Sequence, residues 1–230
     1  MQLSKRLLAV ANLVTTGKRL ADVGTDHAYI PIYLIQKKQV TKAIAMDIGK
    51  GPLQRAKENI QSHGLGEQIE TRCSDGVDKL AVGEVDTVVI AGMGGNLVIR
   101  IVTAGEDVLK NVSELILQPQ SDIGLVRRFL QSNNYQICKE DMVVEDGKYY
   151  PMMCVSHGKM TELSELEYEY GPLLLKMKNP CLKQFLEREQ EQYQEIRKKL
   201  QKNMTDKTKV RLAEVEVKLQ QIERARANYQ

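Results

Sequence analysis

Hydrophobic and polar positions change their period several times along the chain, and each change predicts an element of structure. Residues 3–16 place apolar side chains at the spacing of one helix face. Short apolar runs then alternate with helical segments up to residue 132, and the unbroken run 87–91 is typical of a central strand covered on both faces. We predict strands at 19–24, 42–47, 68–75, 85–93 and 113–119, helices at 28–38, 51–63, 94–104 and 122–132, and a short helical turn after the third strand.

The alternation of strands and helices ends in a different pattern. Residues 136–158 read as two strands around Asp146-Gly147, which is a hairpin signal. Strands that alternate with helices indicate a parallel sheet, and the hairpin adds an antiparallel edge to it. The predicted fold is therefore an α/β, Rossmann-like domain with a seven-stranded mixed sheet, whereas NAD-binding Rossmann domains usually lack the final hairpin.

From about residue 160 the composition shifts to Glu, Lys, Gln and Leu. Two segments, 181–202 and 205–229, carry apolar side chains in steps of four and three, which predicts an antiparallel coiled-coil hairpin of two helices. Residues 203–206 supply its turn and a helix N-cap. The predicted stripes are Leu182, Leu186, Tyr193, Ile196 and Leu200 on the first helix, and Thr208, Leu212, Val215, Leu219, Ile222 and Tyr229 on the second. We therefore predict two domains, 1–160 and 161–230.

Charge adds to this picture through its distribution. The hydrophobic fraction of 42% excludes wholesale disorder, and the net charge of +3 is uninformative by itself. Between residues 197 and 211, however, seven basic side chains face one acid, Asp206, so the tip of the hairpin has a local charge of +6. A solvated helix face is the usual meaning of such a run, while a basic tip can also hold a phosphate backbone.

Several classes of protein are disfavoured by what the sequence lacks. The four cysteines form no C-x-x-C pair, which fits reduced cytoplasmic thiols better than disulfides or a zinc site. No apolar run approaches the roughly 20 residues of a membrane span. Residues 7–14 faintly resemble a signal peptide, but no cleavage site follows them. We expect a cytoplasmic protein with no membrane anchor and no metal.

Residues suited to ligand binding follow the predicted strands, where open parallel sheets bind their ligands. Asp47 follows Gly24 by 23 residues, a position where an acid can accept both ribose hydroxyls; its alternative role is capping the next helix. Asp75 before Gly76 can read an adenine amino group or simply form a turn. Glycines 92, 94 and 95 allow close backbone approach, or tight packing. The stretch 92-GMGGNL-97 is not a dinucleotide fingerprint, because its spacing and its place after a late strand are wrong, and no P-loop lysine is present.

Taken in order, the motifs DVGTDHAYIP (22–31), AMDI (45–48), SDG (74–76), VIAGMGG (89–95) and LQPQ (117–120) resemble the bacterial tRNA (adenine-22 N1)-methyltransferase family. Its members are class I S-adenosylmethionine-dependent methyltransferases with a C-terminal coiled-coil hairpin. The resemblance covers nearly the whole chain and implies methyl transfer from S-adenosylmethionine to N1 of adenine 22 in tRNA. A methyltransferase acting on another RNA or a small molecule, and a non-catalytic RNA-binding protein, are the alternatives.

The resemblance also implies roles for individual residues. The cofactor-binding set is Asp22, Gly24, Asp47, Ile48, Asp75, Gly76, Ala91, Gly92, Met93 and Gly94. The set facing the methyl group and the adenine is Asp26, His27 and Tyr29. The set contacting RNA is Lys5, Arg6, Lys198, Lys199, Lys202, Lys207 and Lys209.

Two departures from common methyltransferase patterns qualify these roles. Commoner methyltransferase loops have another glycine where Asp26 stands, and the N/D-P-P-Y/F motif of amino-group methyltransferases is replaced by Ala91-Gly92-Met93-Gly94. Chemistry at an exocyclic amine is therefore disfavoured. The implied partner is tRNA, and we expect a monomer, with dimerisation through the hairpin as the competing idea.

Overall fold

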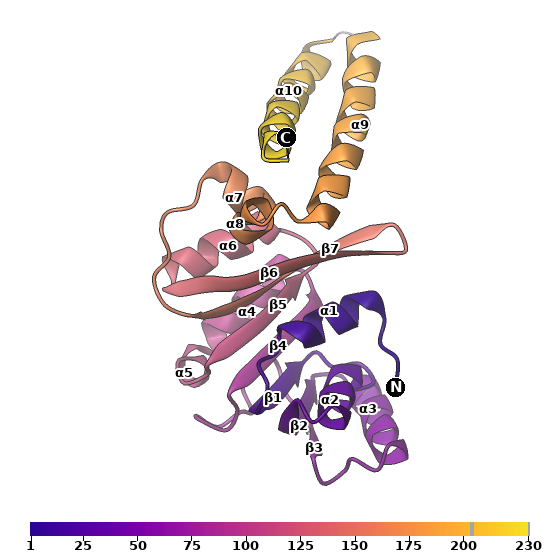
Figure 1. Cartoon of the computed structure of the whole chain (residues 1–230), viewed down its shortest axis with the longest axis vertical. Helices are drawn as coiled ribbons and strands as arrows, with labels where there is room; N and C mark the ends of the chain where they lie inside the picture. Colours follow the sequence, from indigo (N-terminus) through magenta and orange to yellow (C-terminus); the bar gives the residue numbers. More distant parts are fainter. Residues whose placement is uncertain (203–204, 230) are drawn as a thin grey trace. The chain divides into compact units, whose positions relative to one another are not determined.

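A seven-stranded sheet forms the centre of the first part of the chain (Figure 1). The computed structural model describes residues 1–202 and 205–229. The strand order is β3-β2-β1-β4-β5-β7-β6; the first five pair in parallel, and β7 runs antiparallel to both β5 and β6. The strands are β1 (Lys18–Val23), β2 (Val40–Asp47), β3 (Ile69–Cys73), β4 (Thr87–Met93), β5 (Glu114–Pro119), β6 (Tyr135–Glu145) and β7 (Lys148–His157). The predicted mixed sheet is confirmed.

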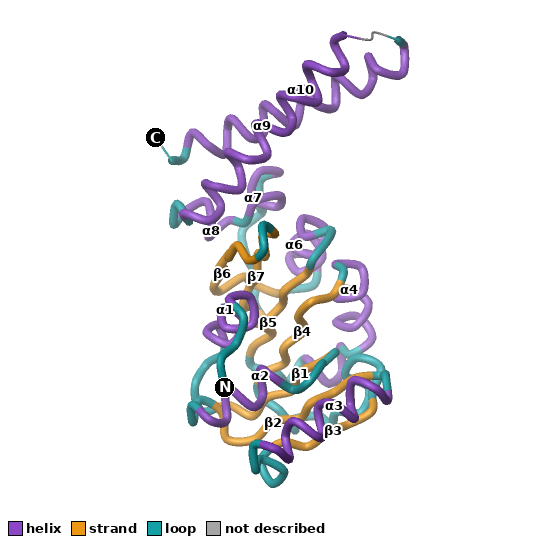
Figure 2. Tube along the Cα trace, turned by 90° about the vertical axis from the view of Figure 1, so that its right-hand side faces the viewer, coloured by secondary structure: helices purple, strands orange, loops and turns teal. Residues whose placement is uncertain are grey.

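Helices cover both faces of this sheet (Figure 2). One face packs against α1 (Lys5–Leu13), α2 (Tyr29–Gln36) and α3 (Lys50–Ser62), and the other against α4 (Gly95–Ala104), α5 (Glu106–Leu109) and α6 (Ile123–Ser132). In β4 the side chain of Val89 enters the first core, while Val88 and Ile90 enter the second. These three side chains are fully buried, on both faces of the strand, which explains why its sequence is apolar without alternation.

The connections between strands hold one confirmed and one wrong prediction. In the β6–β7 turn, Asp146 and Gly147 both have positive φ (49° and 72°), as expected for a two-residue hairpin loop. The helical turn predicted after the third strand is wrong, since residues 74–86 form a loop of turns without a helix. The buried side chains of Val77, Leu80 and Val85 cover the sheet there instead. The four-residue α5 has no apolar period and was not predicted.

A buried carboxylate fixes the N-terminal helix to the sheet. Glu114, at the start of β5, accepts hydrogen bonds from the Thr15 backbone N–H (2.8 Å), the Thr15 hydroxyl (2.6 Å) and the Thr87 hydroxyl (2.8 Å). Because Thr15 lies just beyond the end of α1, this cluster ties the helix to β4 and β5. At the start of α1, Ser4 caps the helix by accepting a bond from the Leu7 N–H.

Residues 163–230 form a second compact unit. It contains α7 (Glu165–Tyr170), α8 (Pro172–Lys176), α9 (Pro180–Lys202) and α10 (Asp206–Ala227). The short α7 and α8 were not predicted; α7 begins with a capping box between Ser164 and Glu167. The N-cap predicted within residues 203–206 is confirmed and is Thr205, while residues 203 and 204 of the predicted turn lie outside the described residues.

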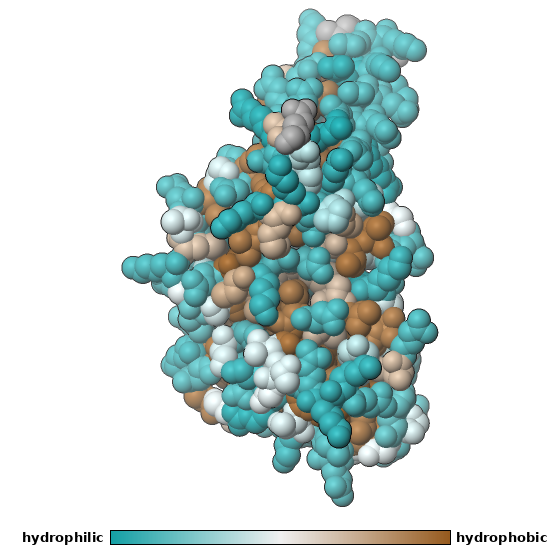
Figure 3. Space-filling view, in the orientation of Figure 1, coloured by the Kyte–Doolittle hydropathy of each residue, from teal (hydrophilic) through white to brown (hydrophobic). Residues whose placement is uncertain are grey.

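The α9–α10 pair is an antiparallel hairpin, as predicted. Ion pairs join Arg197 to Glu216 and Arg226 to Glu187, so that the end of one helix meets the start of the other. Its buried seam consists of Leu182, Leu186, Val215, Leu219, Ile222 and Ala225. The other apolar members of the predicted stripes are only partly buried, and the surface of the hairpin is mostly hydrophilic (Figure 3).

Candidate active site

A cavity of about 280 Å³ opens at the carboxyl ends of β1 and β4. These two strands are neighbours in the sheet although they are not consecutive in the chain, so the cavity lies where the strand order reverses. Open α/β sheets bind their ligands at this point. The lining residues are Arg6, Leu7, Asp22, Gly24, Thr25, Asp26, His27, Tyr29, Ile30, Ala91 and Gly92. The cavity therefore brings together the first loop, the predicted set Asp26, His27 and Tyr29, and residues Ala91 and Gly92 of the fourth strand tip.

The first loop turns sharply at Gly24. This residue has a φ of 75°, and a side chain there would collide with the terminal methyl of Met93 from the fourth strand tip. The backbone N–H groups of Gly24 and Thr25 both bind the carbonyl of Met46 on β2 (2.8 Å each). A single glycine is enough for the turn, because the backbone N–H groups of this loop bind to β2 and do not form the N-terminus of a helix.

The Asp22 carboxyl is buried beneath this loop, with 6% exposure. Its Oδ2 accepts a hydrogen bond from the Thr25 hydroxyl at 2.7 Å. Burial raises the pKa of Asp22 to about 6, because the desolvation of the charged form outweighs the Thr25 bond, and the nearby Asp47 raises the pKa further. A buried carboxylate with one donor is suited to bind a cationic group that enters the cavity.

Asp26, His27 and Tyr29 stand together at the rim. The imidazole of His27 and the ring of Tyr29 are stacked, with centroids 5.1 Å apart and planes 8° from parallel. The His27 Nε2 lies 3.6 Å from the Asp26 Oδ1. On its other side this Asp26 oxygen accepts two bonds from the Arg55 guanidinium of α3, at 3.0 and 2.9 Å. The predicted catalytic set is thus assembled in space, with an arginine that the sequence did not single out.

The second strand tip offers a carboxylate and an apolar side chain. The Oδ1 of Asp47 accepts the N–H of Gly49 at 2.6 Å, and Gly49 is the N-cap residue of α3. Asp47 therefore orders the turn into α3 through one oxygen, so both alternatives for this acid remain compatible with the fold. Ile48 follows with 67% exposure, an unusual position for a large aliphatic side chain.

The third strand tip lies outside the main cavity. Asp75 and Gly76 line a separate hollow of about 40 Å³ together with Arg100 of α4. Both oxygens of Asp75 face the Arg100 guanidinium, at 3.3 and 3.4 Å. These are long hydrogen bonds between exposed groups, and they leave the carboxylate accessible to a further donor.

The fourth and fifth strand tips are joined by a side chain whose role the sequence did not reveal. Gln118 of β5 is fully buried, and its Oε1 accepts bonds from the Gly92 N–H and from Arg6 Nη1, both at 3.1 Å. The Arg6 guanidinium also lies 5.6 Å from the ring centroid of Tyr150, in cation–π geometry. Predicted as an RNA contact, Arg6 thus forms part of the cavity wall. The sequence signals for Gln118 were its place in the LQPQ motif and its polar side chain directly after the apolar run of β5, but neither indicated its partners.

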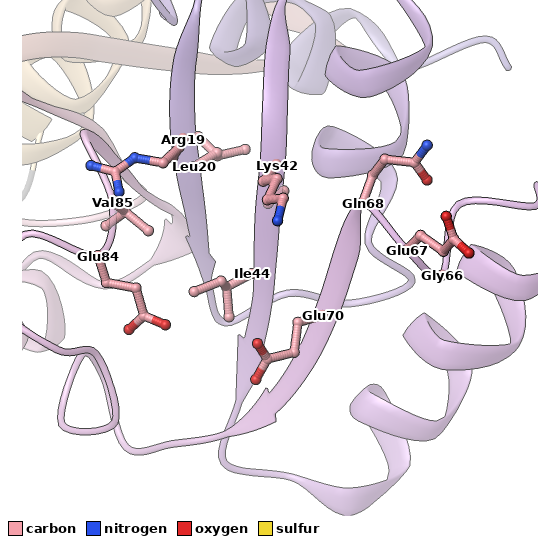
Figure 4. Close-up of a pocket in the computed structure, with 11 residues that line it drawn as sticks. Arg19, Leu20, Lys42, Ile44, Gly66, Glu67, Gln68, Glu70, Glu84 and Val85 are labelled. Atoms are coloured by element: carbon pink, nitrogen blue, oxygen red, sulfur yellow. The ribbon is translucent and has the colours of Figure 1, made fainter.

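A larger cavity, of about 400 Å³, lies elsewhere on the sheet (Figure 4). It lies toward the amino ends of β1, β2 and β3, where Lys42, Ile44 and Glu70 project from the same face. Two of its acids, Glu70 and Glu84, share one ion-pair partner, Arg72, at 2.8 Å each. None of the predicted site residues lines it, so volume alone does not identify the active site.

The basic tip of the hairpin keeps part of its charge free of ion pairs. Arg197, Lys209 and Arg211 bind Glu216, Asp206 and Glu214. Within residues 1–202 and 205–229 no ion pair is formed by the exposed side chains of Lys198, Lys199, Lys202 and Lys207. Lys5 is exposed at the start of α1, where its backbone N–H binds Glu145.

The donor set of the main cavity fits S-adenosylmethionine. Gly92, with a φ of 79°, leaves room where a side chain would come within 3.4 Å of Arg6 Nη1. The carboxylates of Asp22 and Asp26, together with the close backbone approach that the cavity's glycines allow, are suited to a ligand that carries an ammonium and a sulfonium. In the described part of the chain, no three His, Cys, Asp or Glu side chains are grouped to hold a metal ion. No helix described here combines the length and hydropathy that crossing a membrane requires.

Comparison with known proteins points in the same direction. The model of the tRNA (adenine(22)-N(1))-methyltransferase family matches residues 20–224. A Bacillus subtilis protein named tRNA (adenine(22)-N(1))-methyltransferase is 39% identical over 158 residues, which are 69% of this chain and 66% of that protein. The crystal structure of the B. subtilis m1A22 tRNA methyltransferase has a TM-score of 0.85 at 33% identity, covering 97% of this chain and 98% of that one. A Mycoplasma capricolum relative, solved with S-adenosyl-homocysteine, has a TM-score of 0.85 at 30% identity and is covered completely, as is this chain.

Proposed function

This chain belongs to the tRNA (adenine(22)-N(1))-methyltransferase family, and we propose that its strand-tip cavity binds S-adenosylmethionine while Asp26, His27 and Tyr29 face the adenine. The enzyme transfers a methyl group from S-adenosylmethionine to N1 of adenine 22 in tRNA. The observation that carries the assignment of residues is the gathering of the first loop and the fourth strand tip around one cavity at the switch point of the sheet.

The cofactor supplies an electrophilic methyl group on a sulfonium. Asp22 is proposed to accept from the ammonium of the methionine portion, because it is the buried carboxylate of the cavity. Asp47 is proposed to accept the ribose hydroxyls through the oxygen that Gly49 leaves free. Asp75 is proposed to accept from the adenine amino group, with Ile48 against the face of that base. Ala91 and Gly92 line the cavity, and together with Met93 and Gly94 they are proposed to border the sulfonium, while Gly76 lets the third tip turn.

Chemistry at adenine N1 makes modest demands on the protein. The ring nitrogen has an in-plane lone pair and no proton to lose, so no strong general base is required. The protein must free this Watson–Crick edge from pairing, align it with the methyl group and exclude water. The parallel rings of His27 and Tyr29 offer a stacking surface for the exposed base. Methylation leaves a positive charge on the adenine, which a carboxylate at the position of Asp26 stabilises.

The decisive experiment uses an unmodified tRNA transcript. Incubation with isotopically labelled S-adenosylmethionine, followed by digestion and nucleoside mass spectrometry, should yield 1-methyladenosine, and a transcript with adenine 22 replaced should yield none. A different methylated nucleoside, or methylation of the replaced transcript, would overturn the assignment. Failure to bind the cofactor by calorimetry would favour a non-catalytic RNA-binding protein.

The helical hairpin is proposed to hold the tRNA body. Its support is the set of exposed lysines at the tip, which lack ion pairs among the described residues. Reversing Lys198, Lys199 and Lys202 to glutamate should weaken tRNA binding and make the remaining affinity less dependent on salt, while cofactor affinity stays unchanged. The matched control reverses Lys37, Lys38 and Lys42, three exposed lysines that do not line the cavity at the β1 and β4 tips. Unchanged tRNA affinity in the first variant, or an equal loss in the control, would contradict this role.

Two further expectations accompany this function. We expect a monomer, because the apolar seam of the hairpin is already covered within one chain. Light scattering that reports a dimer would contradict this and would support association through the helices. We also expect the protein to act in the cytoplasm, where its tRNA substrate is found.

A further inference from the structure

The loop that carries the catalytic candidates has an unfavourable backbone. His27 and Ala28 have φ angles of 64° and 54°, so two consecutive residues with side chains occupy the left-handed region. Residues with a side chain rarely adopt this conformation. Histidine, like asparagine and aspartate, adopts it more readily than most, so Ala28 carries more of the strain, which persists only where the surroundings hold it in place. Something outside the loop must therefore hold it.

Helix α3 makes the contacts that hold the loop. The Arg55 guanidinium donates from Nε and Nη2 to the Oδ1 of Asp26 at 3.0 and 2.9 Å. One helical turn later, the Asn59 side chain donates from Nδ2 to the backbone carbonyl of His27 at 2.7 Å. Residues four apart share a helix face, so the two side chains act from the same side. Together they bind the Asp26 carboxylate, just before the strained pair, and the peptide between His27 and Ala28, within it.

The exposure of these groups argues against a mainly stabilising role. The Arg55 and Asp26 side chains are 47% and 58% exposed. Ion pairs between exposed groups contribute little to folding stability, because water screens them and both side chains lose freedom. Orientation is a different matter: both donors converge on one oxygen, which fixes the rotation of the carboxylate. The other oxygen, Oδ2, points to no hydrogen-bond donor among residues 1–202 and 205–229.

From these contacts we infer that Arg55 and Asn59 are positioning residues for methyl transfer. They hold His27 and Ala28 in their left-handed conformation, direct the Oδ2 of Asp26 toward the bound adenine and keep the His27–Tyr29 stack at the cavity rim. The inference rests on the proposed function, in which these three side chains face the base. Neither α3 residue lines the cavity, so both act through the loop.

The test compares single variants with a double-mutant cycle, under saturating S-adenosylmethionine and tRNA. Arg55→Ala should lower kcat by about ten-fold or more, since small misplacements of reacting groups have effects of this size. Its cofactor affinity and Tm should stay close to those of the wild type. Arg55→Lys keeps the charge without the fork and should restore part of the rate. Asn59→Ala should also lower kcat, and Lys57→Ala, which removes an exposed charge from the same helix, should not.

The double variant separates this inference from the proposed role of Asp26. If Arg55 acts through the carboxylate, Arg55→Ala should slow an Asp26→Ala enzyme by no more than about two-fold, because the coupled effects are not additive. The inference would be overturned if the two substitutions lowered kcat by independent factors that multiply in the double variant. It would also be overturned if kcat of Arg55→Ala equalled that of Lys57→Ala or exceeded that of the wild type. An Asp26→Ala enzyme with full activity would instead overturn the role of Asp26 itself. A slow Asp26→Ala enzyme beside a fully active Arg55→Ala enzyme would overturn only the inference.

Discussion

Cofactor affinity should depend on pH through Asp22. Its carboxyl is buried at the cavity wall, and burial raises its pKa to about 6 from an ordinary value of 3.8. If the ionised form binds the ammonium of S-adenosylmethionine, affinity is fully present well above pH 6 and is lost as the pH falls through the raised pKa. The direction is opposite to that of a histidine that must be protonated to bind.

The magnitude follows from the ionised fraction. A group with a pKa of about 6 is roughly nine-tenths ionised at about pH 7 and roughly one-tenth ionised at about pH 5. The dissociation constant should therefore rise about ten-fold between these two values, if the protonated form does not bind. An aspartate at its ordinary pKa would change its ionisation by less than about one-tenth over the same interval. The predicted slope thus reports the raised pKa directly.

Isothermal titration calorimetry across this interval provides the measurement. Asp22→Asn should bind more weakly at neutral pH and show little pH dependence. Arg6, Asp26 and His27 also line the cavity, and Asp47 lies close enough to influence Asp22. His27→Gln is therefore the matched control, because histidine is the other residue type that titrates in this range. A flat wild-type profile would refute the reasoning, and so would a slope that persists in Asp22→Asn but vanishes in His27→Gln.

Two further substitutions probe the framework around the site. Glu114→Gln should lower the free energy of unfolding by about 1–3 kcal/mol in urea titrations, because an NH2 group, which cannot accept hydrogen bonds, replaces one of the two oxygens that accept from Thr15 and Thr87; an unchanged midpoint and slope would contradict the importance of that cluster. Gln118→Leu should lower kcat in the tRNA assay by about ten-fold or more, since the Gly92 N–H loses its buried acceptor next to the reacting groups. If instead only Tm falls and kcat of the folded enzyme is unchanged, Gln118 serves folding alone.

The sheet and the order of its ligand-binding tips could be predicted from the sequence because both depend on local patterns. An unbroken apolar run such as 87–91 reports burial on two faces, and Asp146-Gly147 reports a tight hairpin. The strand tips then follow from topology, which brings carboxyl ends to one edge. Short helices escaped prediction because α5, α7 and α8 have four to six residues, too few to show a helical period.

Contacts between elements could not be predicted in the same way. The spacing of Arg55 and Asn59 shows that they share a face of α3, but only the packing of α3 shows that this face meets the first loop. In the sequence Arg6 was only one of two adjacent basic residues near the N-terminus. Its position in the cavity wall depends on its hydrogen bond to the Oε1 of Gln118, which lies far away in the sequence. Contacts between separate elements produce no periodic pattern of residue types in either element, so the sequence pattern does not reveal them.

The first loop shows how side chains replace backbone freedom at this site. A glycine at position 27 or 28 would adopt the left-handed conformation without strain, but glycine 27 would have no ring to stack on Tyr29. Keeping the imidazole at this point requires an external restraint on the backbone, and α3 provides one through the His27 carbonyl. The loop can therefore do without glycines at these positions because Arg55 and Asn59, on the polar face of α3, hold its backbone in place. A substitution that weakens this restraint should change the loop geometry more than the stability of the sheet, because Arg55 and Asn59 belong to neither hydrophobic core.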